Sequence, residues 1–142
     1  MEKYELLRDE FNNELNTLIE TYKTESKKLS EKGSQDEANL EKIKLNVADI
    51  FLKMFNTSYN NVYGKMKLQN IKDAVEAIDD NYKKLYTAYM LFFNKIPAPW
   101  IEKYNKSKEL GMTIENVIEE IKINTANSIK ERFIILYNKY DI

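Results

Sequence analysis

Apolar residues recur three and four positions apart along most of this chain, with polar and charged residues between them. The most regular stretch holds nine such positions, namely Leu68, Ile71, Val75, Ile78, Tyr82, Leu85, Tyr89, Phe92 and Ile96. Because an α-helix makes one turn in about 3.6 residues, this spacing places all nine on one face. It predicts a continuous helix over 67–95 with the buried seam that is typical of helical bundles.

The same spacing predicts three further long helices. The first covers 3–32 and ends before Gly33, a residue suited to the left-handed backbone that closes many helices. The second covers 35–63 and starts at a capping box that Ser34 opens. The last covers 114–140, and we expect its buried row to be Ile114, Ile118, Ile121, Thr125, Ile129, Phe133, Leu136 and Tyr140.

Both prolines and the only tryptophan fall in one short stretch before the last helix. The residue that precedes a proline is disfavoured in helical geometry, so the third long helix should end there. Pro99 suits a first helical turn and predicts a short extra helix over 99–110. We expect Pro97, Pro99 and Trp100 together to anchor this turn on the core.

These segments predict an all-α protein, an up-and-down four-helix bundle with the short extra helix inserted before the last long one. A chain of 142 residues is ordinarily one domain by length, so a single domain is expected over 1–142. No strand-like alternation, nucleotide-binding glycine pattern or internal repeat stands out in the sequence.

The composition excludes several kinds of chemistry, because the chain has neither cysteine nor histidine. Disulfides, thiolate metal sites and cysteine nucleophiles all need cysteine. Histidine is the usual general base near neutral pH and the commonest ligand of transition metals. We therefore expect a non-catalytic protein with no cofactor, no metal site and no small-molecule ligand.

Carboxylates are the remaining candidate metal ligands. The acidic spacing of Asp73, Glu76, Asp79 and Asp80 is similar to that of an all-helical Mg²⁺-dependent pyrophosphohydrolase. If Ile78 lies on the seam, however, most of these acids face solvent, whereas metal ligands in bundle enzymes project inward. A Mg²⁺-dependent nucleotide hydrolase is therefore the first alternative, and it requires Glu76 and Asp79 to face other acids.

The charge is balanced, with 22 Lys and Arg against 23 Asp and Glu and a formal net charge of −1. A nucleic-acid-binding domain usually carries a basic stripe or a strong excess of basic residues. Two local groups of lysines are present, Lys23, Lys27, Lys28 and Lys32 in one and Lys103, Lys106 and Lys108 in the other. A nucleic-acid-associated factor is the second and disfavoured alternative, and it requires both groups on one surface.

Apolar side chains also lie beside two of the predicted seams. They are Tyr86, Met90 and Phe93 in the third long helix, and Ile134, Ile135 and Tyr137 in the last. A helix that is apolar around most of its circumference is either central or covered by a partner. Tyrosine and methionine are enriched in protein interfaces. We expect these six residues to form an interface, with a second copy of the chain as the first choice of partner; the competing interpretation is that the short helix covers them.

The first residues are charged and lack the apolar segment of a signal peptide, and no apolar run approaches the length of a membrane span. We expect a cytoplasmic protein. The abundance of Lys, Asn, Ile and Tyr indicates an AT-rich genome. The sequence as a whole predicts a small helical protein that acts through protein–protein contacts, in a regulatory, adaptor or immunity-type role.

Overall fold

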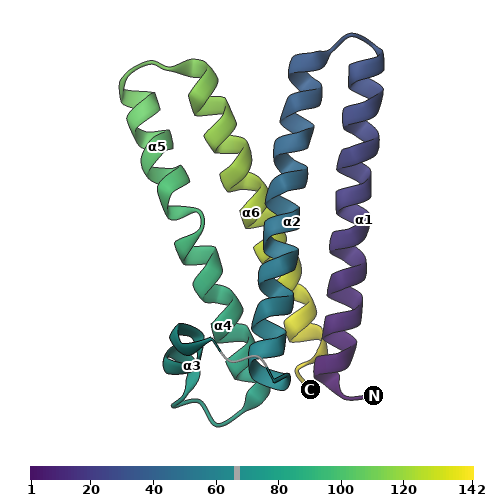
Figure 1. Ribbon diagram of the computed structural model, residues 1–142, viewed down its shortest axis with the longest axis vertical. Helices are drawn as coiled ribbons and strands as arrows, with labels where there is room; N and C mark the ends of the chain where they lie inside the picture. Colours follow the sequence, from purple (N-terminus) through teal and green to yellow (C-terminus); the bar gives the residue numbers. More distant parts are fainter. Residues whose placement is uncertain (66–67) are drawn as a thin grey trace.

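The computed structural model describes residues 1–65 and 68–142, and within them the chain is helical and forms no strand (Figure 1). The helices are α1 (Lys3–Glu31), α2 (Gln35–Tyr63), α3 (Gln69–Val75), α4 (Asn81–Lys95), α5 (Ala98–Glu109) and α6 (Thr113–Tyr140). None of these helices is long and apolar enough to cross a lipid bilayer. The predicted all-α helical bundle is confirmed.

The helices form four antiparallel rods (Figure 1). The first rod is α1, the second is α2, the third is α4 followed by α5, and the fourth is α6. Both termini lie at one end, where Lys3 forms an ion pair of 3.2 Å with Asp141. We call this the closed end. At the other end, which we call the splayed end, the α1–α2 and α5–α6 hairpins diverge (Figure 1).

Three of the predicted long helices are confirmed, since α1, α2 and α6 begin and end within one residue of the predicted bounds. The left-handed backbone expected after the first helix is also present, with a φ of 83° at Gly33. Only glycine adopts this conformation readily.

The continuous helix predicted over 67–95 is wrong. Helix α3 ends at Val75, α4 begins at Asn81, and the segment between them is not helical. Asp80 explains the new start, because its carboxylate accepts a hydrogen bond of 2.9 Å from the backbone amide of Tyr82 and so caps α4. The predicted start of this helix at Lys67 lies outside the described residues.

The break divides the predicted seam between two cores. Ile71, Val75 and Ile78 pack with Ala88 and Phe92 in a small cluster that holds α3 against α4. The residues that follow the break, Tyr82, Leu85 and Tyr89, belong to the main core.

The predicted short helix is present as α5, but it is not an insertion beside a complete bundle. Ile96 and Pro97 keep right-handed helical torsions, so the chain bends after α4 and continues in the same general direction (Figure 1). Helix α5 then packs along α6 and completes the third rod. The extra element of the bundle is therefore α3.

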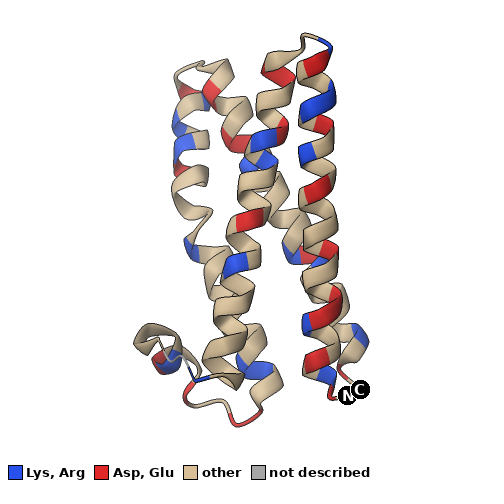
Figure 2. Cartoon of the chain, turned by 45° about the vertical axis from the view of Figure 1, so that its right-hand side comes forward, with Lys and Arg blue, Asp and Glu red and all other residues tan. Residues whose placement is uncertain are grey.

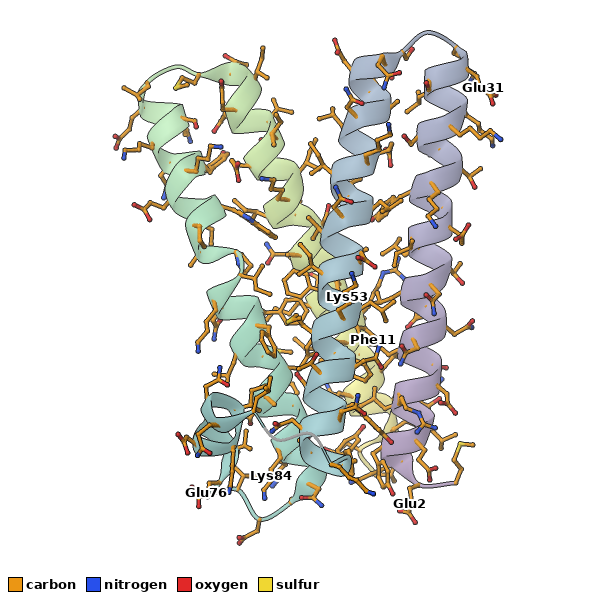
Figure 3. All side chains as sticks on the ribbon, in the orientation of Figure 1. Glu2, Phe11, Glu31, Lys53, Glu76 and Lys84 are labelled. Carbon is orange, nitrogen blue, oxygen red and sulfur yellow. The ribbon has the colours of Figure 1, made fainter. Side chains whose placement is uncertain are left out.

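The main core at the closed end is aromatic. Fully buried rings come from all four rods: Phe11 from α1, Phe51 and Phe55 from α2, Tyr89 from α4 and Phe133 from α6. Figure 3 shows Phe11 in the interior between the rods. The ring centroids of Phe11 and Phe55 lie 4.8 Å apart, and those of Tyr89 and Phe133 also lie 4.8 Å apart. Tilted and edge-to-face pairs of this kind contribute about 0.5–1.5 kcal/mol beyond their buried area.

Candidate protein-binding groove

The six residues predicted as an interface do not form one exposed surface. Phe93 and Tyr137 are each only 7% exposed and lie in the main core, so the prediction is wrong for them. Tyr86 and Met90 are half-buried against the same core, Ile134 is also half-buried, and Ile135 alone is exposed.

The physical reason for this correction is the position of α6. This helix contacts α1, α2, α4 and α5, so several of its faces are covered by the chain itself. A helix that is apolar around most of its circumference is either central or covered by a partner, and α6 is central.

The predicted anchor is present in part. Pro97 is buried and Trp100 is half-buried against the main core, whereas Pro99 is exposed in the first turn of α5. The Nζ atom of Lys122 lies 5.8 Å from the Trp100 ring centroid, within the range of a cation–π contact.

An open groove lies between α2 and α6 at the splayed end. Its apolar walls are Leu40 and Ile43 on α2, which face Ile114, Val117 and Ile118 on α6. The polar residues Asp36, Asn39 and Thr113 complete the lining. We call these eight residues the groove.

The groove continues along α2 toward the middle of the bundle. A second hollow shares Ile43 and is lined by Asn46, Val47, Ile50, Trp100 and Lys122. We call it the extension of the groove. Trp100 thus both anchors α5 and forms part of an apolar wall.

The exposure of the groove overturns the expected burial of the last helix's first turns. Ile114, predicted in the buried row, is 75% exposed, and Val117 is 39% exposed. Further along the same helix, Ile129 and Phe133 are fully buried as predicted. The row is therefore core at the closed end and groove wall at the splayed end.

The third rod explains why the groove is open. Helix α5 has one buried residue, Ser107, and no buried apolar side chain. It packs on α6, whereas α4 packs on α2. The splayed end of the bundle therefore lacks the apolar side chains from the third rod that fill the closed end.

A buried carboxylate lies between α5 and α6. Glu119 is 1% exposed, and its Oε1 atom lies 3.5 Å from Lys103 Nζ and 3.3 Å from Lys122 Nζ. The Oε2 atom of Glu119 and the Oδ1 atom of Asn116 are buried without a hydrogen-bond partner. Because a buried charge is stable only when it is paired, Glu119 holds α5 against α6 through Lys103. Figure 1 shows α5 and α6 together apart from α1 and α2 at the splayed end.

Acids without an ion-pair partner in the described part of the chain lie in the first turns of the two helices that form the groove. Asp36 lines it, Glu37 follows in the first turn of α2, and Glu115 and Glu120 lie in the first turns of α6. In the described part of the chain, none of these four carboxylates forms an ion pair. Both helices begin at the splayed end, where acids complement the positive ends of the helix macrodipoles. Figure 2 shows acidic residues near the starts of both helices.

The requirement of the hydrolase alternative is not met, because Glu76 and Asp79 are both exposed in the segment between α3 and α4. Figure 3 shows Glu76 at the outer edge of the closed end. Asp80 is used as the cap of α4. Among residues 1–65 and 68–142, no group of three or more carboxylates is arranged to hold a metal ion.

The two lysine groups lie on different sides of the molecule. One is on α1 and the other on α5, and these two helices form opposite edges of the bundle in both ribbon views (Figures 1 and 2). The single basic surface that the nucleic-acid alternative requires is therefore not formed by these groups.

Comparison with family models, curated proteins and solved structures finds no match for this chain. The class of protein is therefore defined by the fold alone, as an antiparallel all-α bundle.

Proposed function

We propose that this chain is a non-catalytic helical protein that acts by binding another protein along the groove between α2 and α6. The observation that carries this proposal is the apolar lining of the groove, in which Ile114 and Val117 of α6 are exposed and face half-buried apolar residues of α2. Scattered apolar residues are ordinary on a protein surface, but a contiguous apolar patch with a polar rim is typical of a binding site.

The lining of the groove favours contact over chemistry. Leu40, Ile43, Ile114, Val117 and Ile118 provide apolar area. The polar groups around them are one carboxylate, one amide and one hydroxyl, without a base positioned to activate a nucleophile. Helices α2 and α6 run in the same direction (Figure 1), and an apolar groove between two helices is suited to bind an additional amphipathic helix.

This proposal retains the protein-binding function predicted from the sequence, but it assigns binding to a different surface, the groove. The predicted surface contained Phe93 and Tyr137, which lie in the core. The groove instead includes Ile114 and Ile118, which the sequence assigned to the buried row of the last helix. Self-association and a cytoplasmic location stay predictions, as does an adaptor, regulatory or immunity-type role.

A selection experiment tests the proposal. A displayed library of helical peptides of about 18 residues, long enough for a monomeric helix, would be selected on the wild-type protein. The library would keep one apolar stripe and vary every other position. We expect the selected peptides to lose at least about tenfold in affinity for the Val117→Gln variant, because burial of apolar area at this wall drives binding.

The matched control is Ile135→Gln, which changes an exposed apolar residue on the same helix outside the groove. We expect it to leave the affinity unchanged. Peptides that bind both variants equally well, or a selection that yields no binder, would contradict the proposal.

A further inference from the structure

We infer that the occupant of the groove is an amphipathic helix of a different protein, with an apolar stripe flanked by lysine or arginine. This inference rests on the proposed function, because it specifies the partner of the same groove. It is carried by the shape of the apolar walls together with the charge of the rim.

The apolar walls have the dimensions of a helix-binding surface. On α2, the stripe runs from Leu40 through Ile43 to Ile50, above the buried Val47. At 1.5 Å per residue, these positions span about 15 Å, or nearly three helical turns. On α6, Ile114 and Val117 are three residues apart and therefore lie on successive helical turns. An occupant with apolar residues at i, i+3, i+4 and i+7 matches both walls.

The charge of the rim sets the polarity of the occupant. Asp36 lies in the lining, and Glu120 follows Val117 by three residues and so extends the same face of α6. Both carboxylates are exposed, and neither has an ion-pair partner in the described part of the chain.

Among the described residues, no lysine lines the groove itself, and Lys122, which lines its extension, is paired with Glu119. The charged side chain in the lining of the groove is therefore a carboxylate, that of Asp36. A helix with basic flanks is attracted to it, and a helix with acidic flanks is repelled.

The same charges disfavour a second copy as the occupant. A two-fold dimer through this groove would bring the same patch of both chains together. Asp36 and Glu120 of one chain would then lie near the same unpaired acids of the other, and like charges across an interface are unfavourable.

Three synthetic peptides of about 18 residues separate these contributions. The basic peptide has a leucine stripe at i, i+3, i+4 and i+7 with lysine flanks. The acidic peptide has the same stripe with glutamate flanks. The polar peptide keeps the lysine flanks and replaces the leucines with serine. Their affinities would be measured by fluorescence anisotropy against the full chain, at low and high salt.

We expect the basic peptide to bind at least about tenfold more tightly than the acidic peptide at low salt, and the difference to shrink at high salt. The polar peptide should bind much more weakly than the basic one. Reversal of the rim charges by Asp36→Lys with Glu120→Lys should invert the preference. The control pair Glu25→Lys with Glu131→Lys makes the same change of net charge at exposed positions away from the groove, and it should not invert it.

The outcomes distinguish this inference from the proposed function. If the basic and acidic peptides bind equally, and both lose affinity for Val117→Gln, the groove binds helices but the inferred charge of the partner is wrong. If binding of the basic peptide is unaffected by Val117→Gln and by Ile114→Gln, or if none of the peptides binds, both are overturned. A dimer in light scattering that Val117→Gln dissociates would assign the groove to a second copy and overturn the inference.

Discussion

The closed and splayed ends of this bundle are built from the same four rods, yet one end is filled and the other is open. At the closed end, α4 contributes Leu85, Tyr89 and Phe93 to the core. At the splayed end, α5 contributes no buried apolar residue. The apolar content of one rod therefore determines how tightly a four-rod bundle packs along its length, because the other three rods do not fill the space that this rod leaves.

The two ends also differ in the kind of contact that holds them. Aromatic rings from every rod interlock at the closed end, and the Tyr89 hydroxyl donates a hydrogen bond of 2.8 Å to the Phe51 carbonyl. In the α5–α6 hairpin, the buried polar groups include Ser107 of α5 and Glu119 of α6. We therefore expect most of the folding free energy to reside at the closed end.

The largest expected effect is a loss of stability at the closed end. Phe133→Ala removes a fully buried ring that contacts Phe11, Phe55 and Tyr89. We expect a loss of about 3–5 kcal/mol in the free energy of unfolding, measured by urea denaturation. Val117→Ala at the splayed end should cost about 1 kcal/mol or less. Equal losses in the two variants would contradict the division between the ends.

Alkaline pH should act mainly on the closed end. Burial raises the pKa of Tyr89 well above its ordinary value, and burial with the nearby carboxylates of Asp141 and Asp80 raises the pKa of Tyr137 to about 12. The unfolded phenols ionise near pH 10, so unfolding favours ionisation above this pH. The stability from these groups is fully present below about pH 10 and is lost as pH rises through the folded pKa values.

Urea denaturation at several alkaline pH values checks this expectation. The slope of stability against pH should be shallower in Tyr137→Phe than in the wild type, because one shifted phenol has been removed. A wild-type stability that does not fall above pH 10 would show that these phenols are not protected by folding.

A smaller effect is expected where Glu119 holds α5. Glu119→Gln keeps the shape of the side chain and removes its attraction to Lys103 and Lys122. We expect the free energy of local opening of α5 to fall by about 1 kcal/mol, which is close to fivefold in the opening equilibrium. This change should appear as faster amide exchange in α5. Exchange around Phe133 should not change. The matched control is Glu131→Gln, at an exposed position of the same helix; if it accelerates exchange in α5 equally, the role of Glu119 is refuted.

The smallest effect is expected at Ile135, which is 66% exposed. Ile135→Ser should change the free energy of unfolding by no more than about 0.5 kcal/mol. It should also leave the molar mass from light scattering unchanged. A dimer that this substitution dissociates would restore Ile135 to the interface predicted from the sequence.

Periodicity alone predicted three of the four rods, because α1, α2 and α6 have regular apolar spacing and no strong interruption between their ends. It failed at the third rod. The spacing from Leu68 to Ile96 has no gap, but Asp80 can cap a helix, and its local hydrogen bond to Tyr82 divides the stretch. A regular apolar pattern does not require a continuous helix when each half can pack in a different cluster.

The groove could not be read from the pattern, because an apolar stripe looks the same whether a neighbour covers it or not. Ile114 and Ile129 have equivalent places in the periodicity of the last helix, but one is 75% exposed and the other is fully buried. The informative sequence feature lay in α5, whose residues after Trp100 are mostly charged or polar. A rod with so few apolar residues cannot cover a stripe on two neighbours.

The central claim is that the splayed end is open while the closed end is packed, and single-cysteine labelling tests it most directly. The chain has no cysteine, so each introduced thiol reports on one position. Val117→Cys places a thiol in the groove wall, and Ala126→Cys places one at a position on the same helix that is 1% exposed. We predict that the Val117→Cys thiol reacts at nearly the rate of the unfolded chain and the Ala126→Cys thiol at least about 100-fold more slowly, as a buried site requires local opening. Equal protection of both thiols would show that the two hairpins close on each other, and it would contradict the account.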